Sequence, residues 1–308
     1  MTAPVDSGPT DRSAGGALYV VATPIGNLGD VTLRALETLR SVPLVACEDT
    51  RVTRRLLVRH GIDARLVSFH ARSAPRRLAE LLDHLRGGAD LALTTDAGTP
   101  GISDPGEALA AAWAGEGGRV VPIPGPSAAT AAVSVAGLAG PRWAFEGFLP
   151  RAGRERRERL AGLAADHRGT VLYEAPSRLA ATLRDLAAAC GDDRPAAVCR
   201  ELTKLHEQIV RGSLRELVEA ATDGRVPPRG EVVIVLGAWP AVRQDAAAAR
   251  GSDPASAAGW AIGDARAAVD ALVADGVARG EAARQVARRT GISRRQLYQP
   301  PGAHDPRD

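Results

Sequence analysis

The sequence predicts an α/β protein with two α/β domains and a small C-terminal helical module. Between residues 17 and 237, short apolar runs alternate with longer amphipathic ones, which is the pattern of strands alternating with helices. The densest turn signal inside this stretch is Pro124-Gly125-Pro126, and two sheets divided there are more economical than one sheet of ten strands. A cleft between the two α/β domains is therefore the expected binding site.

Ten apolar runs have the length of strands, and they lie at 18–22, 44–47, 66–69, 91–94 and 120–123, then at 143–148, 171–174, 197–200, 207–211 and 232–236. The helices expected between them include 74–85, 154–165 and 179–189, and a run of small residues predicts another over 128–140. Near the C-terminus, helices are expected over 265–274, 281–289 and 294–298. The segment Thr290-Gly291-Ile292-Ser293 joins the last two of these helices. A Gly that ends one helix and a Ser that caps the N-terminus of the next are typical of a helix-turn-helix.

These elements predict a domain order along the chain. A disordered tail is expected over 1–16, an N-terminal α/β domain over 17–125 and a C-terminal α/β domain over 126–237. Residues 238–259, rich in Ala, Gly, Ser and Asp, have the composition of a linker, and a helical module follows over 260–308.

The composition is that of a globular protein with a core of its own, since 45% of the 308 residues are hydrophobic. Cys47, Cys190 and Cys199 are odd in number and lack metal-ligand spacing, so we expect buried free thiols in a reducing cytoplasm and no metal. No signal-type N-terminus and no run of 18 apolar residues occurs, so we expect a cytoplasmic protein without a membrane segment.

The most informative segment is TTDAGTPGISDPG at 94–106, which follows an apolar run and precedes an Ala-rich one. Its glycines allow backbone conformations that are closed to other residues, and its prolines fix others. Asp96 and Asp104 can accept hydrogen bonds from hydroxyls or amines. So rigid a loop at the carboxyl end of a strand predicts a small-molecule site.

Other predicted strands also end in candidate binding residues. Residues 23–30 form a second Gly and Pro loop whose amides can hold an anion or a carboxylate. Glu48 and Asp49 open a helix, where acids also complement the helix dipole. Glu146 and Glu174 each stand beside an aromatic residue at a strand terminus. Neither GxGxxG nor GxxxxGK[ST] occurs, which disfavours a conventional dinucleotide fold and a P-loop.

Eight motifs between residues 18 and 237 carry a resemblance, and in order they are ATPIGNLGD, ACEDTR, TTDAGTPGISDPG, PIPGPSAAT, FEGFLP, YEAPSRL, RELTKLHEQIVRG and GEVVIVLG. The chain resembles the tetrapyrrole-methylase superfamily and, within it, the 16S ribosomal RNA cytidine 2′-O-methyltransferases, the ribosomal small subunit methyltransferase I family. This resemblance implies S-adenosylmethionine as methyl donor in the cleft between the α/β domains, 16S rRNA of the small ribosomal subunit as substrate, and a homodimer. The residues then expected to bind the donor are Pro24, Gly26, Asn27, Asp96, Ala97, Gly98, Thr99, Ser127, Thr130, Glu146 and Glu174.

Lys204 is the candidate catalytic base. It is the only lysine among 39 basic residues, and a chain so biased toward arginine keeps a lysine most plausibly where arginine cannot serve. A guanidinium stays protonated, whereas a desolvated lysine beside other cations can lose its proton near neutral pH. Glu201 is expected to orient Lys204 or pair with it. Drift on a surface helix explains a single lysine equally well on composition alone, and His206 is a rival base.

Two Arg-rich runs predict contacts with RNA phosphates. Residues 151–159 hold five Arg against Glu155 and Glu158, a net charge of +3, and residues 277–308 hold seven Arg against three acids, a net charge of +4. The expected phosphate ligands are Arg154, Arg156, Arg157, Arg178, Arg200, Arg288, Arg289, Arg294 and Arg295. Either run also fits a merely solvated helix face.

Two other functions stay open: a methylase of cobalamin or sirohaem precursors, and a DNA-binding helix-turn-helix regulated by a ligand in the α/β core.

Overall fold

The structure is a computed structural model, and it describes residues 15–70, 75–103, 106–238, 262–274, 276–290 and 292–298. The chain divides into two compact units, Met1–Ala241 and Val242–Asp308, which we describe separately. Several expectations lie outside the described residues: the tail over 1–14, Asp104 and Pro105 in the 94–106 loop, nearly all of the linker, and the side chains of Arg288 and Arg289.

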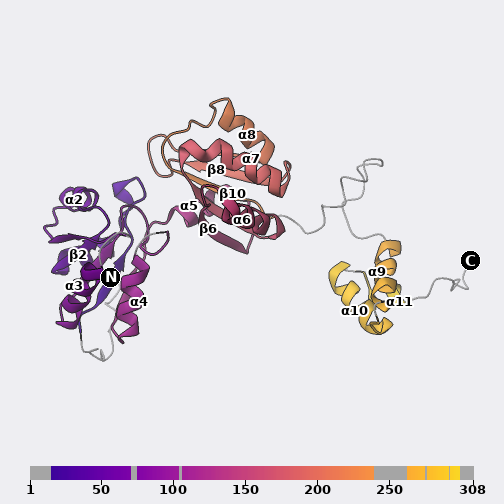
Figure 1. Cartoon of the computed structure of the whole chain (residues 1–308), viewed down its shortest axis with the longest axis horizontal. Coiled ribbons are helices and arrows are strands. Elements are labelled where there is room, and N and C mark those ends of the chain that lie inside the picture. Colours follow the sequence, from indigo (N-terminus) through magenta and orange to yellow (C-terminus); the bar gives the residue numbers. More distant parts are fainter. Residues whose placement is uncertain are drawn as a thin grey trace, which may run out of the picture. The chain divides into compact units, whose positions relative to one another are not determined.

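The first sheet is wholly parallel, with strand order β3-β2-β4-β1-β5. Its strands are β1 (Leu18–Val21), β2 (Leu44–Cys47), β3 (Leu66–Ser68), β4 (Leu91–Thr94) and β5 (Val120–Ile123), and its helices are η1 (Leu28–Asp30), α1 (Leu33–Ser41), α2 (Thr50–Arg59), α3 (Pro75–Arg86) and α4 (Gly106–Gly115) (Figure 1). One core packs α1 and α2 against the sheet, and a separate core packs α3 and α4 against its other face. All five carboxyl ends therefore meet at one edge, where open α/β sheets bind ligands.

The second sheet is mixed, with strand order β6-β7-β10-β8-β9. Its strands are β6 (Trp143–Phe148), β7 (Gly169–Glu174), β8 (Pro195–Arg200), β9 (Gln208–Ser213) and β10 (Val232–Leu236), and its helices are α5 (Ala128–Ala136), α6 (Gly153–Ala165), η2 (Pro176–Arg178), α7 (Leu179–Cys190) and α8 (Leu214–Thr222). Only β6 and β7 pair in parallel. Leucines of α6, α7 and α8 cover one face, and the alanines of α5 cover the other.

The second unit is a small bundle of α9 (Ile262–Ala274), α10 (Arg279–Thr290) and α11 (Arg294–Tyr298). Its core is built from small and branched residues, among them Ala265, Val269, Val286 and Leu297. This module has the helix order that the sequence predicts.

The two-sheet α/β architecture predicted from the sequence is confirmed, and β2, β4, β5, β6 and β10 have the predicted bounds. The helix expected over 128–140 was too long, because α5 ends at Ala136 with Gly137 in the left-handed conformation at φ 68°. The boundary at residues 125–126 and the other predicted domain limits stay predictions. Among the described residues, no helix is both long and apolar enough to cross a membrane.

Arg194 ties three parts of the second sheet together. It lies just before β8, is only 1% exposed, and donates to the carbonyl oxygens of Leu163 at 2.9 Å, Arg168 at 3.1 Å, and Asp166 and Gly237 at 3.3 Å. These oxygens belong to the end of α6, the turn before β7 and the residue after β10. A buried guanidinium with this many acceptors is structural.

We expect Arg194→Leu to lower the free energy of unfolding by at least about 3 kcal/mol, because several carbonyl oxygens lose their donor at once. Urea unfolding followed by circular dichroism measures the change. The matched control is Arg215→Ala, whose side chain is 60% exposed and pairs only with surface aspartates, and which should cost about 1 kcal/mol or less. A loss below 1 kcal/mol in Arg194→Leu would contradict this role.

Candidate functional site

A cavity of about 470 Å³ lies within the first unit, and both sheets contribute to its wall. The volume is in the usual range of small-molecule sites. The residues that line it are Ile25, Glu48, Thr95, Asp96, Ala97, Gly98, Thr99, Ile102, Ser103, Ser127, Ala128, Phe148, Tyr173, Glu174, Ala175, Pro176, Cys199, Leu202, Gly230, Glu231, Val232 and Val233.

The loop after β4 is pinned from two sides. Thr23, just after β1, forms a two-way backbone bridge with Gly98: Thr23 N donates to Gly98 O at 2.8 Å, and Gly98 N donates to Thr23 O at 3.1 Å. Gly98 has a φ of 91°, which favours glycine, and the Thr99 hydroxyl donates to Pro126 O at 3.1 Å. Residues 95–99 are thereby fixed along the cavity wall, between the end of β1 and the start of α5.

The cavity wall is acidic. It carries the carboxylates of Glu48, Asp96, Glu174 and Glu231, and no Arg, Lys or His is among its described residues. Burial, with the charges of Glu48 and Asp49 adding to it, raises the pKa of Asp96, although the Asp49 amide donates to its Oδ1 at 2.9 Å. Glu174 and Glu231 are paired with Arg178 and Lys204, so the carboxylates of Glu48 and Asp96 are the ones that favour a positively charged ligand.

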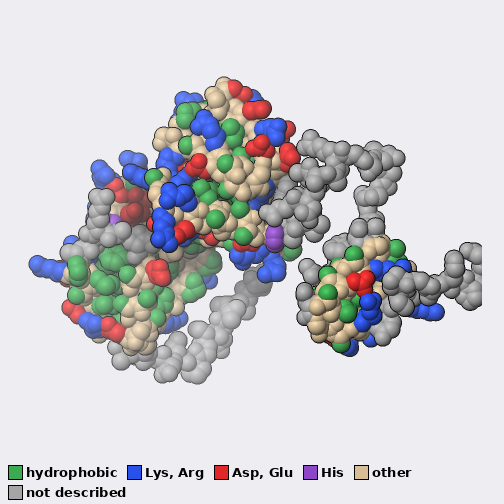
Figure 2. Space-filling model, turned by 45° about the vertical axis from the view of Figure 1, so that its right-hand side comes forward, with side chains coloured by type: hydrophobic (Ala, Val, Ile, Leu, Met, Phe, Trp, Pro, Cys, Tyr) green, Lys and Arg blue, Asp and Glu red, His purple; other side chains and the backbone are tan. Residues whose placement is uncertain are grey.

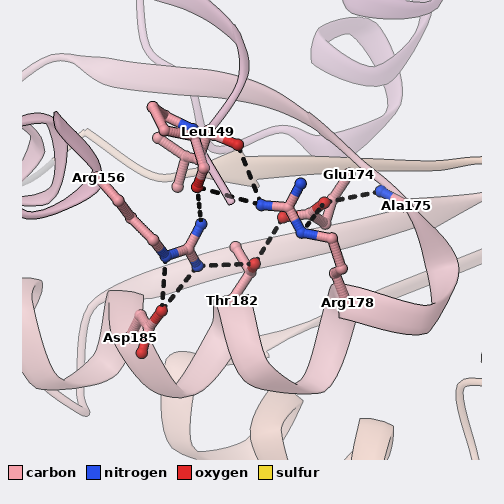
Figure 3. A network of polar contacts seen from close by, with 8 residues as sticks. Leu149, Arg156, Glu174, Ala175, Arg178, Thr182 and Asp185 are labelled. Carbon is pink, nitrogen blue, oxygen red and sulfur yellow. Dashed lines mark hydrogen bonds and ion pairs between the residues drawn. The ribbon is translucent and has the colours of Figure 1, made fainter. Parts of the chain in front are cut away.

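Glu174, at the end of β7, is 3% exposed, and both of its carboxylate oxygens are engaged (Figure 3). Oε1 accepts from the Ala175 amide at 2.8 Å and lies 3.3 Å from Arg178 Nε, and Oε2 accepts from the Thr182 hydroxyl at 2.5 Å. Arg156 in turn donates to the same hydroxyl oxygen at 3.0 Å. This network fixes the strand end and the turn that line the cavity.

Two sequence comparisons show which protein family the chain belongs to. The model of the tetrapyrrole (corrin/porphyrin) methylases matches residues 17–218. The ribosomal RNA small subunit methyltransferase I of Synechocystis sp. is 44% identical over 284 residues, which are 92% of this chain and 96% of that protein. The chain belongs to the tetrapyrrole methylases, in the branch of the ribosomal RNA small subunit methyltransferases I. The resemblance stated from its motifs is confirmed.

Solved structures agree on the fold. Cobalt precorrin-4 methyltransferase, a cobalamin biosynthetic enzyme, superposes with a TM-score of 0.54 at 19% identity and covers 72% of this chain and 94% of its own. Uroporphyrin-III C-methyltransferase from Thermus thermophilus, complexed with S-adenosylhomocysteine, gives a TM-score of 0.52 at 20% identity and covers 72% and 97%. At these identities the likeness shows the tetrapyrrole-methylase fold alone.

Six of the residues predicted to bind the donor line the cavity of this methyltransferase, and they are Asp96, Ala97, Gly98, Thr99, Ser127 and Glu174. The remaining five are not among its lining residues. Asn27 caps η1, Thr130 donates to Ser127 O, and Glu146 pairs with Arg159 at 2.9 Å. Pro24 and Gly26 belong to the loop that follows β1.

Several lining residues are not among those predicted to bind the donor. Glu48 was paired with Asp49 as an acid that opens a helix, but only Asp49 caps α2, whereas Glu48 lines the cavity and accepts from the Thr95 hydroxyl at 3.1 Å. Its position at the end of a predicted strand was the available signal. The contributions of Cys199 and of Gly230 to Val233 had no local signal, because they depend on how β8 and β10 are placed in the second sheet.

Lys204 and Glu201 do form a pair, but the surroundings of Lys204 differ from those expected. Its Nζ lies 2.8 Å from Glu201 Oε1 and 2.8 Å from Glu231 Oε2, so its neighbours are carboxylates rather than cations. Burial alone would lower the pKa of Lys204, but these hydrogen bonds and charges outweigh it, and its pKa is raised. The same pair lowers the pKa of Glu201. The expectation of a lysine with a depressed pKa is wrong for this arrangement.

Three of the predicted phosphate ligands are occupied within the protein. Arg156 is buried and pairs with Asp185 at 2.7 Å, Arg200 is buried and donates to the carbonyls of Arg229 and His206, and Arg178 is bound to Glu174. We therefore correct their assignment, because a guanidinium already bound to acceptors within the protein is not available to a phosphate.

Of the predicted phosphate ligands whose side chains the structure describes, Arg154, Arg157, Arg294 and Arg295 are exposed at the surface. Arg154 has a side chain that is 86% exposed and that pairs with Glu158 at 2.6 Å. On the face shown in Figure 2, basic side chains lie interspersed with acidic ones rather than in one uniform patch.

We expect Asp96→Asn to weaken binding of S-adenosylmethionine, which carries a sulfonium, by about tenfold, the equivalent of one charge interaction of about 1.4 kcal/mol. Because the pKa of Asp96 is raised above the ordinary 3.8, the wild-type affinity should fall as the pH drops through that raised value, and this fall should be smaller in the variant. Titration calorimetry across the acidic range measures both effects. Asp63→Asn, an exposed acid outside the cavity lining, is the control, and equal affinities in all three proteins would remove Asp96 from the site.

Proposed function

We propose that this methyltransferase transfers the methyl group of S-adenosylmethionine to the ribose 2′-hydroxyl of a cytidine in 16S rRNA, acting on the small ribosomal subunit in the cytoplasm. The observation that carries the choice of substrate class is the 44% identity to a ribosomal RNA small subunit methyltransferase I over 92% of the chain. The cavity supports the choice of donor, since the carboxylates of Glu48 and Asp96 in its wall suit a sulfonium.

The chain's own groups suggest how the donor is held. The fixed backbone of residues 95–99 and the start of α5 can supply hydrogen bonds, and the carboxylates of Glu48 and Asp96 stabilise positive charge. The product, S-adenosylhomocysteine, has a neutral sulfur and gains less from those carboxylates. The site therefore favours the substrate form of the donor over its product.

A methylase of tetrapyrrole precursors is the second candidate, because both solved structures above belong to that chemistry. Their identities of 19% and 20% carry the fold and not the substrate. The choice between the two acceptors therefore rests on the 44% identity to a ribosomal RNA small subunit methyltransferase I, which favours the first candidate.

The deciding experiment incubates the protein with methyl-labelled S-adenosylmethionine and either small ribosomal subunits or precorrin-type macrocycles. We expect label in the subunits, and 2′-O-methylcytidine after nuclease digestion and mass spectrometry of the nucleosides. Label in the macrocycle alone would refute the proposal.

The homodimer implied by the resemblance is part of the proposal, and sedimentation of the purified protein tests it.

Lys204 and Glu201 belong to the proposed reaction centre, in one of two roles. Either Lys204 accepts the hydroxyl proton, or it stays protonated and holds Glu201 and Glu231 beside the acceptor. The two 2.8 Å contacts and the raised pKa favour the second role, since a lysine shared by two carboxylates keeps its proton. The first role requires the RNA to displace those carboxylates.

Single-turnover methylation by Lys204→Arg and Lys204→Ala separates the two roles. A charge clamp should keep much of its rate as Arg and lose it as Ala, whereas a proton acceptor should lose about a hundredfold or more in both. The pH profile is an independent readout. Because the pKa of Lys204 is raised above 10.5, a base would give a rate that climbs throughout the neutral range, and a clamp predicts no such climb from this group.

Replacing Arg154 and Arg157 with Ala should weaken subunit binding and flatten its salt dependence, because each lost phosphate contact reduces the log-log slope by about 0.9 or less. Affinity for S-adenosylmethionine should not change. The matched control is Arg76→Ala, on the exposed surface of α3, where the side chain pairs with Glu80. An unaltered slope in the double variant would show that this part of α6 is only a solvated face.

A further inference from the structure

Two aromatic side chains line the cavity and a third packs against one of them, in a chain that has only three Phe and three Tyr. Tyr173 packs edge-on against Phe145, with ring centroids 4.9 Å apart at 70°, and against Phe148, with centroids 5.6 Å apart at 65°. Tyr173 and Phe148 both line the cavity, and Phe145 does not. The chain thus concentrates half of its Phe and Tyr residues beside one site.

A β-bulge brings these rings together. In the parallel pairing of β6 with β7, Phe145 is opposite Val171, Gly147 is opposite Leu172, and Phe148 is opposite Tyr173, so the register shifts by one residue at Glu146. Side chains three residues apart normally point to opposite faces of a strand. The additional residue cancels that alternation, so that Phe145 and Phe148 can both contact Tyr173.

Two local features hold the bulge in place. Gly147 has a φ of 62°, and a Cβ there would lie 3.0 Å from Ser103 Oγ, so this position favours glycine. The extra residue, Glu146, is bound by Arg159 of α6, with Nε 2.9 Å from Oε2. Bulges next to functional sites often re-aim a side chain, and here the side chain that is re-aimed is Phe148.

Phe148 remains 54% exposed although it belongs to a sheet strand. Five other large apolar residues are exposed to a comparable degree in the described part of the chain, and none of them is aromatic or lines the cavity. Tyr173 steadies the Phe148 ring through an edge-to-face contact, an arrangement in which a neighbouring ring is held without its π-surface being fully covered. An exposed, steadied ring at the mouth of a cavity is suited to stacking on a flat heterocycle.

We propose that Phe148 is the platform on which the base of the target nucleotide stacks during methyl transfer, an inference that rests on the proposed function. A specific base in RNA is recognised when it is splayed out and stacked on an aromatic side chain. The chain from Phe148 runs through residues 149–152 directly into α6, where Arg154 and Arg157 are exposed. One continuous segment therefore carries a stacking ring and the basic side chains suited to the adjoining phosphates.

The donor also contains a flat heterocycle, its adenine, and the half-exposed position of Phe148 favours the substrate base over it. A group that enclosed the donor would be expected deeper in the wall, as Cys199 and Val233 are, each at most 6% exposed. Phe148 lines the cavity and is 54% exposed, so a macromolecular substrate can reach its ring.

The test compares Phe148→Ala, Phe148→Tyr and Val58→Ala. The apparent second-order rate constant for methylation of small subunits is measured at saturating S-adenosylmethionine, and donor affinity is measured separately by calorimetry. Stacking of one base on one ring predicts a loss of about 5-fold to 100-fold in Phe148→Ala, with donor affinity within about twofold of the wild type. Phe148→Tyr should restore the rate, because tyrosine offers the same π-face.

Val58→Ala is the matched control, an exposed apolar residue on α2 outside the cavity lining, and its rate constant should not change. Phe148→Leu, which preserves apolar bulk without a ring, should behave like Phe148→Ala if stacking is the cause, and its cooperative melting shows that the fold is retained. A loss of donor affinity in Phe148→Ala would assign the ring to the adenine and overturn the proposal. A normal rate in Phe148→Leu would overturn it as well. Failure of the wild-type protein to methylate subunits would instead refute the proposed function, and this inference with it.

Discussion

The buried carboxylate of Glu174 is the constraint on which the second half of the site depends. A carboxyl group that is 3% exposed is stable only if its oxygens are paired, and removing one partner of such a network costs about 3–5 kcal/mol. The partners come from η2, from α7 and, through Thr182, from α6, so the carboxylate fixes the end of β7 relative to three other elements. The position of Tyr173, one residue before Glu174, follows from that anchorage, and with it the ring arrangement at the cavity mouth.

The same constraint decides which arginines can meet RNA. Arg156 and Arg178 are held at Glu174, at Thr182 and at backbone carbonyls, while Arg194 and Arg200 bind carbonyl oxygens inside the second sheet's domain. A segment rich in arginine is therefore not equivalent to a basic surface. In residues 151–159 the side chain of Arg156 faces inward, whereas Arg154 and Arg157, on the exposed side of the same helix, remain available.

The sequence was sufficient for the features that depend on neighbours along the chain. The apolar runs predicted the strand bounds to within two residues, and the Gly and Pro loop after β4 correctly indicated that residues 96–99 line the cavity. The failures involve partners that are distant in sequence: Glu231, which shares Lys204, is 27 residues away, and Asp185, which binds Arg156, is 29 residues away. No local pattern says whether a lysine will meet cations or carboxylates, so the prediction of a depressed pKa for Lys204 rested on composition and was wrong. The bulge at Glu146 was not predicted for the same reason, because the register of β6 is defined only by its pairing with β7.

The charges of the site are divided in a way that suits its two proposed ligands. The charged residues of the described cavity wall are all acids, and Glu48 and Asp96 among them favour a cationic donor. The exposed arginines Arg154 and Arg157 lie outside the wall, where a polyanion would approach. If cations lined the cavity, they would oppose the sulfonium and attract phosphates into the donor's place. Lys204 fits this division because Glu201 and Glu231 neutralise its charge, and its side chain packs against the loop after β1, where a Cβ on Gly26 would lie 2.4 Å from its Cγ. The lysine can thus connect the loop after β1 to the second sheet's domain without placing an unpaired positive charge beside the donor.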